Sequence, residues 1–305
     1  MGREVRTNCV ALLTEVLHSR RMDSGGWAYR GSAQESIETT CLAALAFTSD
    51  TDSRCAANAF LLRSQLANGS WPAFPGDSEG SWTTALAVCT LNMTGEFEAQ
   101  RDKAARWLVA DRGREAHWLW RWKFKTLDRA VRFDPDKYGW PWSPDTASWV
   151  IPTAFSIVAL KQYAACNRSE ASEKRISLGV EMLLDRACLG GGWNAGNSLV
   201  FGIPLRPHAE TTAISLLALQ DEPHSRTVRD ALEWLKTRSA NIRSADSLAW
   251  CILSLFLYQQ PVEPLKDALA MRLRGGIDNE NTATIATALL ALKCGEMIHP
   301  FEVVR

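Results

Sequence analysis

Six stretches of the chain are apolar on almost every side and share one composition, with Thr or Ser near the start and Ala and Leu throughout. They cover residues 37–47, 81–91, 150–160, 209–219, 245–255 and 283–292. A helix that is hydrophobic all round is buried on most sides. The pattern therefore predicts six inner helices that share one core.

Between these stretches lie more polar segments, at residues 9–21, 53–67, 100–111, 172–187, 225–239 and 262–274. In them apolar residues recur every three or four positions while Arg, Lys, Asp and Glu fill the other face, which is typical of amphipathic helices. Gly follows several of the segments, as at Gly25 and Gly190, and Gly commonly ends a helix because it adopts positive φ. We expect these segments to be outer helices that face solvent.

The alternation of outer and inner helices predicts helical hairpins, each of which buries a face of its neighbour. An open row of hairpins needs a polar cap at each end, and neither terminal pair looks atypical here. We therefore expect an all-α fold, an α/α toroid or (α/α)6 barrel of about six helical hairpins, with residues 1–305 forming a single domain.

Residues 113–145 interrupt the repeat and are rich in Trp, with Trp118, Trp120, Trp122, Trp140 and Trp142. This insert is too long for a plain hairpin loop, so we expect it to carry function or to cover one mouth of the barrel. The alternation of aromatic and other residues in its first part would also suit a short amphipathic segment at a membrane interface, where Trp is favoured.

The whole chain balances 34 Lys and Arg against 34 Asp and Glu, so its net charge is zero. Without a basic block, the sequence has no electrostatic footprint for nucleic acid and no reason to prefer an anionic membrane. No apolar run is long enough to span a bilayer, and the N-terminus lacks a signal-peptide pattern. The 8 Cys form no CxxC pair, which fits buried thiols in a reducing compartment. We expect a cytoplasmic protein with no nucleic-acid partner and at most peripheral membrane contact.

Several segments carry a family resemblance. FLLRSQLANGSW (60–71) resembles the QW repeat of squalene–hopene and oxidosqualene cyclases. GGWAYRG (25–31) and GGWNAG (191–196) resemble the same superfamily, which includes the protein prenyltransferase β subunits, and GWPWSPDTASWV (139–150) is similar to bacterial prenyltransferase and squalene-oxidase repeat proteins. The resemblance implies an α/α barrel over nearly the whole chain. Full triterpene cyclases have two such barrels, whereas this chain has the length for one.

The resemblance also implies chemistry at the starts of the inner helices. A proton-initiated cyclase needs a carboxylic acid in a dry cavity, which the family carries in an Asp-x-Asp-Asp-Thr-Ala motif. When the inner segments are aligned by their last apolar residue, acids occupy the middle-Asp position at Glu38, Glu210 and Asp246. No segment has the full motif, and the one that begins at His208 comes closest. We expect Glu210 to donate the proton, tuned by His208, with Glu38 and Asp246 as further acids. The alternative is that each acid merely complements its helix N-terminus.

Aromatic side chains near the same helix starts would stabilise a carbocation through their ring faces. The candidate substrate-binding aromatics are Trp82, Trp149, Trp250, Trp140, Trp142 and Phe155. Of these, we expect Trp82, Trp149 and Trp250 to form the cation-stabilising wall. The alternative for each is plain core packing.

Protein prenyltransferases offer a second comparison, because they bind zinc through an Asp-x-Cys pair and a later His. Here His208 falls at the His position and Asp145 lies near the Asp position, but Ala147 stands where the Cys would be. The missing thiolate disfavours a zinc site, so we expect no metal and no cofactor. Asp145 is kept as a candidate substrate-binding residue.

The preferred function is a terpenoid-cyclase-like enzyme that cyclises or otherwise transforms an isoprenoid or similar apolar chain in a central, aromatic-lined cavity. One alternative is a non-catalytic barrel that binds an isoprenoid, or that joins a partner protein supplying a second barrel. A carbohydrate-active α/α barrel is a further alternative, which would need two carboxylates facing each other across a cleft.

Overall fold

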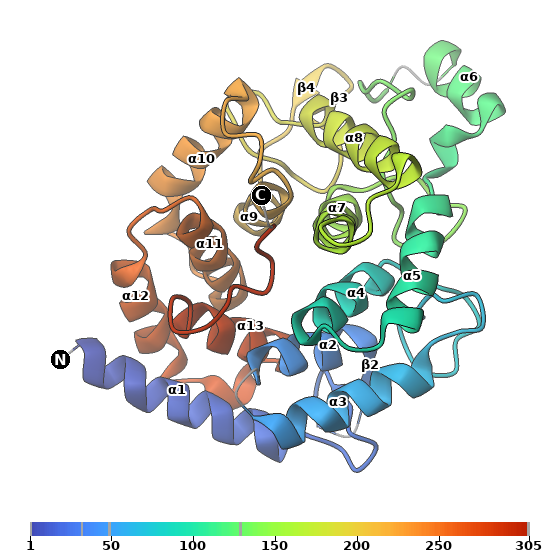
Figure 1. The fold of residues 1–305 in the computed structure, drawn as a ribbon. Helices are drawn as coiled ribbons and strands as arrows, with labels where there is room; N and C mark the ends of the chain where they lie inside the picture. The colour runs from blue at the N-terminus through green and yellow to red at the C-terminus, as the bar shows by residue number, and fades with distance from the viewer. Residues whose placement is uncertain (1, 32, 48–49, 128–129, 304–305) are drawn as a thin grey trace.

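The computed structural model describes residues 2–31, 33–47, 50–127 and 130–303. Its helices form two concentric rings, which confirms the predicted α/α toroid (Figure 1). The inner ring consists of α2 (Ile37–Ala46), α4 (Thr83–Thr94), α7 (Val150–Ala164), α9 (Ala209–Ala218), α11 (Ala245–Leu257) and α13 (Thr282–Leu292). The outer ring consists of α1 (Gly2–Ser19), α3 (Thr51–Ser64), α5 (Glu98–Ala110), α8 (Glu170–Asp185), α10 (Arg226–Ser239) and α12 (Glu263–Leu273).

The inner ring is closed. Each inner helix packs on the next in chain order, and α13, the last of them, packs on α2, the first. The outer helix α1 packs on both α12 and α13, so it covers the place where the two ends of the chain meet. Closure explains why neither end of the sequence carries the polar cap that an open stack of hairpins requires.

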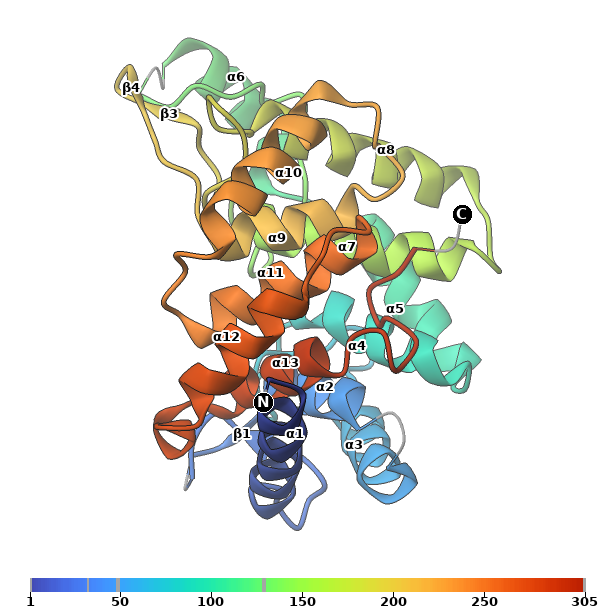
Figure 2. The same ribbon diagram turned by 90° about the vertical axis from the view of Figure 1, so that its left-hand side faces the viewer.

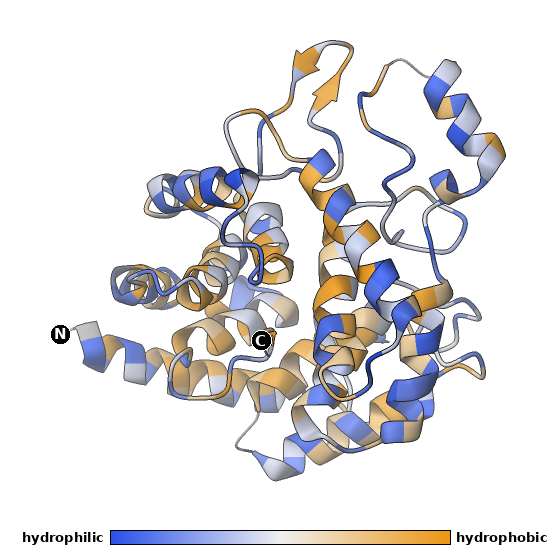
Figure 3. Ribbon diagram, turned by 45° about the horizontal axis from the view of Figure 1, so that its top comes forward, coloured by the Kyte–Doolittle hydropathy of each residue, from blue (hydrophilic) through white to orange (hydrophobic). Residues whose placement is uncertain are grey.

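The two rings differ in hydropathy as the sequence pattern predicts. All eleven residues of α13 are buried, as are nine of the ten in α2. The outer helices bury one stripe each; in α10 the stripe is Val228, Ala231, Leu235 and Ser239. Inner helices are therefore mostly apolar around their whole circumference, while outer helices alternate polar and apolar faces (Figure 3).

Four inner helices start beside a buried Trp that ties them to the preceding outer helix. The four are Trp27, Trp71, Trp140 and Trp193, each at most 1% exposed. Each indole N–H donates to a carbonyl oxygen of an outer helix, as Trp193 does to Leu183 at 2.6 Å. Each Trp backbone N–H donates to a Thr hydroxyl in the first turn of the inner helix, as Trp193 does to Thr212 at 2.9 Å. We call this pair of bonds the Trp–Thr clamp; it fixes how far each inner helix extends along the barrel.

The insert between α5 and α7 is anchored at its base and projects at its tip. Glu115 is 1% exposed, accepts a hydrogen bond from the backbone N–H of Ser148 and pairs with Arg186 at 3.6 Å. After a short 3-10 helix (Arg114–Ala116), the chain forms α6 (Trp118–Thr126), which buries none of its residues. Because α6 lies beyond the outer ring (Figures 1 and 2), it does not cover the centre of the barrel.

Two short antiparallel hairpins lie in the connections from outer to inner helices. One pairs β1 (Trp27–Ala28) with β2 (Glu35–Ser36), and the other pairs β3 (Leu199–Val200) with β4 (Ile203–Pro204). The hairpins and α6 lie at the same end of the barrel (Figure 2). In the described part of the chain, no helix combines the length and apolar character needed to cross a bilayer.

Residues 293–303, here called the C-terminal strap, fold back across the opposite end of the barrel (Figures 1 and 2). Phe301 of the strap is fully buried, and its carbonyl oxygen accepts a hydrogen bond from the Gln220 side chain at 2.7 Å. Gln162 donates to the carbonyl oxygens of Pro300 and Glu302. The strap therefore closes one end of the toroid and leaves the other end as its mouth.

Candidate active site

The first turns of the six inner helices meet around one cavity of about 250 Å³. Each inner helix contributes two residues spaced four apart, which lie one above the other on the same helix face. The ring nearer the mouth, here called the mouth ring, consists of Glu38, Trp82, Ile151, Glu210, Asp246 and Ala283. The second ring, one turn deeper, consists of Leu42, Leu86, Phe155, Ile214, Trp250 and Thr287. Tyr29, Trp142, Asn281 and Thr284 complete the lining.

The mouth ring has an acidic side and an aromatic side. Its acids come from α2, α9 and α11, and its large apolar residues from the neighbouring helices α4 and α7. Below each acid the second ring is apolar, with Leu42, Ile214 and Trp250. The cavity therefore has carboxyl groups at its rim and an apolar interior below them, and the three acids lie at the positions where the alignment of the inner segments places them.

The three carboxyl groups favour their protonated forms. Burial raises the pKa of Glu38, of Glu210 and of Asp246, and for Asp246 the value is about 7. The negative charges of Glu210, Glu38 and Glu280 add to the shift of Asp246, and Glu210 likewise raises the pKa of Glu38. Among the described residues no Lys, Arg or His forms an ion pair with any of the three. Burial and mutual repulsion thus favour the protonated form at all three positions, and a pKa of about 7 leaves Asp246 partly protonated near neutral pH.

The three acids differ in their immediate partners. Glu38 accepts a hydrogen bond from the hydroxyl of Tyr29, which lowers its pKa and partly offsets burial. His208 has the corresponding effect on Glu210, because its electrostatic interaction lowers the pKa of that carboxyl group and partly offsets burial. For Asp246, burial and the neighbouring negative charges all raise the pKa, and no described residue offsets them. Glu210 and Glu38 are accordingly the acids whose carboxylate forms are best supported.

The aromatic side is a continuous series of ring contacts. Trp142 meets Trp82 edge to face, with ring centroids 5.1 Å apart, and Trp82 lies 5.7 Å from Phe155. Phe155 contacts Trp250 at 5.6 Å, and both contact Phe301 of the C-terminal strap, at 5.8 and 5.5 Å. Trp82, Trp142, Phe155 and Trp250 form one wall of the cavity, with Phe301 packed against the last two, so a chain inside it would lie against π surfaces.

The remaining candidate residues lie outside the cavity. Trp140 is held in a Trp–Thr clamp, with the Arg175 guanidinium 3.4 Å from its ring centroid. Trp149 precedes α7 and lies next to Gly196 in the neighbouring connection. His208 is exposed at the N-cap of α9, and Asp145 is exposed in the insert at a positive φ of 60°. The structure thus groups Glu38, Glu210, Asp246, Trp82, Trp142, Phe155 and Trp250 at the cavity.

Sequence reasoning did not single out several residues of the cavity lining, among them Tyr29 and Asn281, or Phe301, which packs against the aromatic wall. Tyr29 follows the first Gly-Trp segment by two residues, so its position beside a helix start was a usable signal. Asn281 caps α13, where its side chain accepts from the backbone N–H of Thr284. Phe301 had no local signal, because its role depends on the strap folding back across the barrel.

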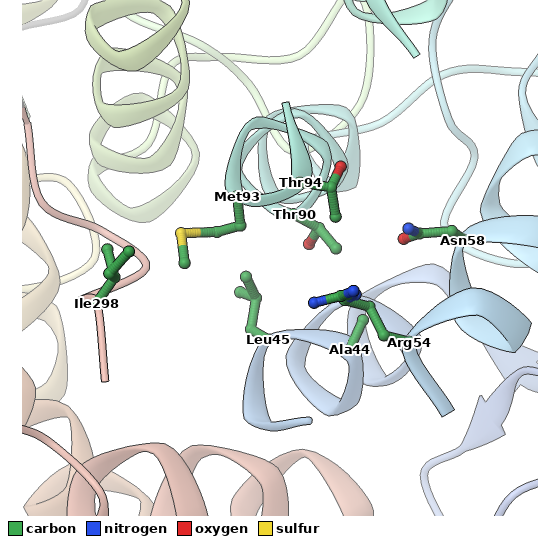
Figure 4. Close-up of a pocket in the computed structure, with 8 residues that line it drawn as sticks. All are labelled: Ala44, Leu45, Arg54, Asn58, Thr90, Met93, Thr94 and Ile298. Carbon is green, nitrogen blue, oxygen red and sulfur yellow. The ribbon is translucent and has the colours of Figure 1, made fainter. Parts of the chain in front are cut away.

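Nothing in the described residues points to a metal centre, since no group of three or more His, Cys, Asp or Glu is arranged to hold an ion. A second cavity of about 210 Å³ lies between α2, α3, α4 and the C-terminal strap, where Arg54, Asn58 and Thr90 provide its polar lining and Ile298 borders it (Figure 4). None of the mouth-ring acids reaches this second cavity. The two cavities are therefore chemically distinct.

The fold defines the class of α/α-toroid proteins, and comparisons with known proteins agree. No family model matches the sequence, and no curated protein matches it. Among solved structures, the type II terpene cyclase MstE from Scytonema, bound to merosterolic acid A, superposes with a TM-score of 0.61 at 14% identity, covering 95% of this chain and 97% of that one.

Sugar-degrading enzymes share the fold to a similar degree. Endoglucanase Cel10, a family 8 glycosyl hydrolase from Klebsiella pneumoniae, has a TM-score of 0.57 at 12% identity, covering 94% of this chain and 100% of that one. An endo-1,4-D-glucanase from Vibrio fischeri has a TM-score of 0.59 at 10% identity, with 96% and 98% covered. These likenesses establish the toroid fold and agree with the terpenoid-cyclase resemblance at that level.

Proposed function

We propose that this protein is a terpenoid-cyclase-like enzyme, in which a carboxylic acid at the mouth ring protonates an isoprenoid or similar apolar chain held in the central cavity. The observation that carries the proposal is the division of one cavity into an acidic rim and an aromatic wall. A protein of the same fold, the Scytonema type II terpene cyclase, has been solved with its substrate geranylgeranyl dihydroxybenzoate, at a TM-score of 0.59. That precedent supports an apolar chain as the ligand class.

The proposed chemistry needs no reactant beyond the substrate. A protonated carboxyl group donates its proton to one carbon of a C=C bond, so an O–H bond breaks, a C–H bond forms and the neighbouring carbon becomes cationic. Further double bonds of the chain attack the cation and close rings. The faces of Trp82, Phe155 and Trp250 stabilise the migrating charge. The last cation loses a proton, which restores the carboxyl group directly or through water.

Glu210 is the proposed donor. A donor has to be protonated at rest yet release its proton readily. Burial raises the pKa of Glu210 and so favours its protonated form, while His208 favours the carboxylate that remains after donation. The N-terminus of α9 supports the same carboxylate through the helix dipole. In this proposal Asp246 and Glu38 are further acids at the rim, and the final proton returns to the Glu210 carboxylate.

The test uses the purified protein with squalene and with geranylgeraniol, followed by mass spectrometry of cyclic products. We expect Glu210→Gln to lower turnover by about 10²–10⁴-fold, the usual contribution of a general acid. The matched control is Glu170→Gln, which changes an exposed acid in the first turn of the outer helix α8. Unchanged turnover in Glu210→Gln, with an active parent protein, would contradict the role of Glu210.

A carbohydrate-active function is the second candidate, favoured by the glucanases of the same fold and by the number of acids at the rim. Glycosidases use two carboxyl groups on opposite sides of the scissile bond. In this structure the acids occur together with a largely aromatic and aliphatic second ring, which suits a hydrocarbon better than a polar sugar chain. Release of reducing sugar from a β-glucan by the parent protein, lost in Glu210→Gln, would establish the second candidate.

A non-catalytic role is the third candidate, because no inner helix carries the complete acid motif of the cyclases. In that case the cavity would bind an isoprenoid without converting it, or the barrel would join a partner protein that supplies a second barrel. Binding of geranylgeraniol without any product, in the parent protein and in Glu210→Gln alike, would favour this role.

A further inference from the structure

The mouth end of the molecule carries an unusual concentration of exposed apolar side chains. Within the insert they are Trp118, Leu119, Trp122 and Leu127, and in the β3–β4 connection they are Phe201, Ile203 and Leu205. Trp118 is 71% exposed and Phe201 is 79% exposed, although such side chains are normally buried. We call these seven residues the mouth-side crest.

The two parts of the crest form one projection. Val131, which follows α6, forms an antiparallel bridge with Val200 of β3. The backbone N–H of Phe201 donates to the carbonyl oxygen of Ala130 at 2.6 Å, and that of Arg132 donates to Leu199 at 3.3 Å. The insert and the hairpin therefore support each other, and both rise beyond the outer ring at the same corner (Figure 2).

The helix in the crest has the composition of an interfacial helix. Trp118 and Trp122 are four residues apart, so they lie on one face of α6. The helix contains Arg121, Lys123 and Lys125 and no acidic residue. Since α6 buries nothing, its apolar residues contribute nothing to the core of the barrel. An exposed Trp-rich face beside basic residues is what a helix needs to lie at a headgroup layer.

Basic residues also surround the crest on the protein side. Arg112, Arg114, Arg132 and Arg206 are exposed around it. Asp136 pairs with Arg121 and Lys125, Asp145 lies in the same groove as Arg112 and Arg114, and Glu115 is buried, so the remaining cations leave a positive excess at the surface. The whole chain is neutral, which is why its net charge gives no sign of this local excess. Attraction to an anionic surface depends on the local charge within about one Debye length.

The crest lies at the same end of the barrel as the acid-rimmed cavity. The insert contributes Trp142 to the cavity wall, and the backbone N–H of Trp82 donates to the carbonyl oxygen of Trp142 at 3.1 Å. A surface that holds the crest would therefore face the mouth rather than the strap-closed end. For an apolar ligand, such an orientation shortens the path from a bilayer to the cavity.

We propose that the mouth-side crest docks this protein onto an anionic phospholipid surface, with Trp118, Trp122 and Phe201 inserted among the headgroups and the surrounding Arg and Lys side chains against lipid phosphates. Charge complementarity and the projecting shape select this partner. Protein–protein interfaces are depleted of Lys, whereas α6 places Lys123 and Lys125 beside its exposed Trp side chains. The docking does not depend on the reaction in the cavity and can be tested without any substrate.

The test is flotation with two kinds of vesicle, one of phosphatidylcholine alone and one that also contains about 30% phosphatidylglycerol. In the second kind about one lipid in three is anionic, and basic protein surfaces bind such membranes. We expect binding to the anionic vesicles, weakened by salt. The variant Trp118→Ala/Trp122→Ala/Phe201→Ala should bind at least tenfold more weakly. The matched control is Met271→Ala/Ile298→Ala, which removes apolar side chains that are 70% and 75% exposed elsewhere on the molecule.

Further measurements separate docking from misfolding and from self-association. The crest variant should keep the parent's circular dichroism and melting temperature, because none of its three positions is buried. Lys123→Glu/Arg132→Glu should lose the preference for phosphatidylglycerol. Equal binding by the parent and crest variants would overturn the proposal. A second result would also overturn it. If the parent failed to bind vesicles but formed a concentration-dependent dimer in sedimentation, and the crest substitutions abolished that dimer, the crest would bind a second copy of the chain.

Discussion

At the scale of single residues, the mouth-ring acids are costly to the folded state. Glu38, Glu210 and Asp246 lie in positions where burial and mutual repulsion disfavour ionisation. A folded protein that raises the pKa of an acid binds its proton more tightly than the unfolded chain does. Stability is therefore lost as the pH rises through the interval between the two pKa values, and such costs are common at functional sites.

Asp246→Asn tests this cost. The unfolded pKa is about 3.9 and the folded pKa is about 7. Below pH 4 the carboxyl is protonated in both states, so the variant and the parent should be equally stable. Above pH 7 the parent carries a buried charge, and the variant should be more stable by about 1–2 kcal/mol, allowing for the part of the side chain that stays solvated.

The measurement is urea unfolding of both proteins at pH 4 and pH 8. The control is Asp77→Asn, which changes an exposed acid in the loop before α4 and should alter stability at neither pH. A stability difference for Asp246→Asn that is the same at both pH values would show that packing, rather than ionisation, governs this position.

At the scale of elements, the Trp–Thr clamps fix where four of the inner helices, α2, α4, α7 and α9, begin. In the last of them, the Thr212 hydroxyl accepts the backbone N–H of Trp193, and both residues are fully buried. Because α9 carries Glu210 two residues before Thr212, a shift of the clamp would move the acid relative to the cavity. The clamp thus links packing to the geometry of the site.

Thr212→Val removes the acceptor while keeping the shape of the side chain. The Trp193 N–H would then be buried without a partner, which costs about 1–3 kcal/mol. Thr237→Val, at an exposed position of α10, is the control and should change stability by less than about 0.5 kcal/mol. Thermal unfolding of both variants gives the comparison. Equal melting temperatures would mean that the clamp does not contribute to the free energy of unfolding.

The C-terminal strap is the second element that shapes the site. Phe301 is fully buried and contacts Phe155 and Trp250, two residues that line the cavity, so it supports that part of the cavity wall. Phe301→Ala should cost about 3–5 kcal/mol and deepen the cavity. Binding of a series of n-alcohols, followed by calorimetry, should therefore shift toward longer chains. Ile298→Ala, in the same strap but 75% exposed, should leave the chain-length preference unchanged. An unchanged preference in Phe301→Ala would exclude Phe301 as a support of the cavity wall.

These elements also show what the sequence can and cannot predict. Helical periodicity places Glu38, Glu210 and Asp246 in one ring because equivalent positions of a repeat lie at equivalent heights. It cannot tell a Trp in the cavity from a Trp in a clamp, and Trp140 is an example: its Gly-Trp context matches Trp27 and marks it as a clamp residue only once the repeated hydrogen bonds are known. Phe301 depends on a contact between the chain's last residues and its middle, which no local pattern encodes.

At the scale of the whole molecule, closure joins parts of the chain that are far apart in sequence. The outer helix α1 packs on α12 and α13, and Arg6 of α1 pairs with Glu263 and Asp267 of α12. In an open stack each hairpin depends only on its neighbours in sequence. In a closed ring the first helix also supports the last, so damage at the N-terminus should be felt near the C-terminus.

Leu13→Asp tests closure directly. Leu13 is fully buried on the inner face of α1, and a charge there would be unpaired, so α1 should detach or the chain should lose several kcal/mol of stability. Hydrogen exchange should then become faster in α12 and α13, about 250 residues away in sequence, as well as in α1. The neighbouring substitution Leu12→Asp is the control, because Leu12 is 38% exposed and can present the charge to water. If faster exchange in Leu13→Asp stayed within α1 and the adjoining β1 segment, the ring would behave as an open stack, and the mouth ring would lose the support that holds its six first turns around one cavity.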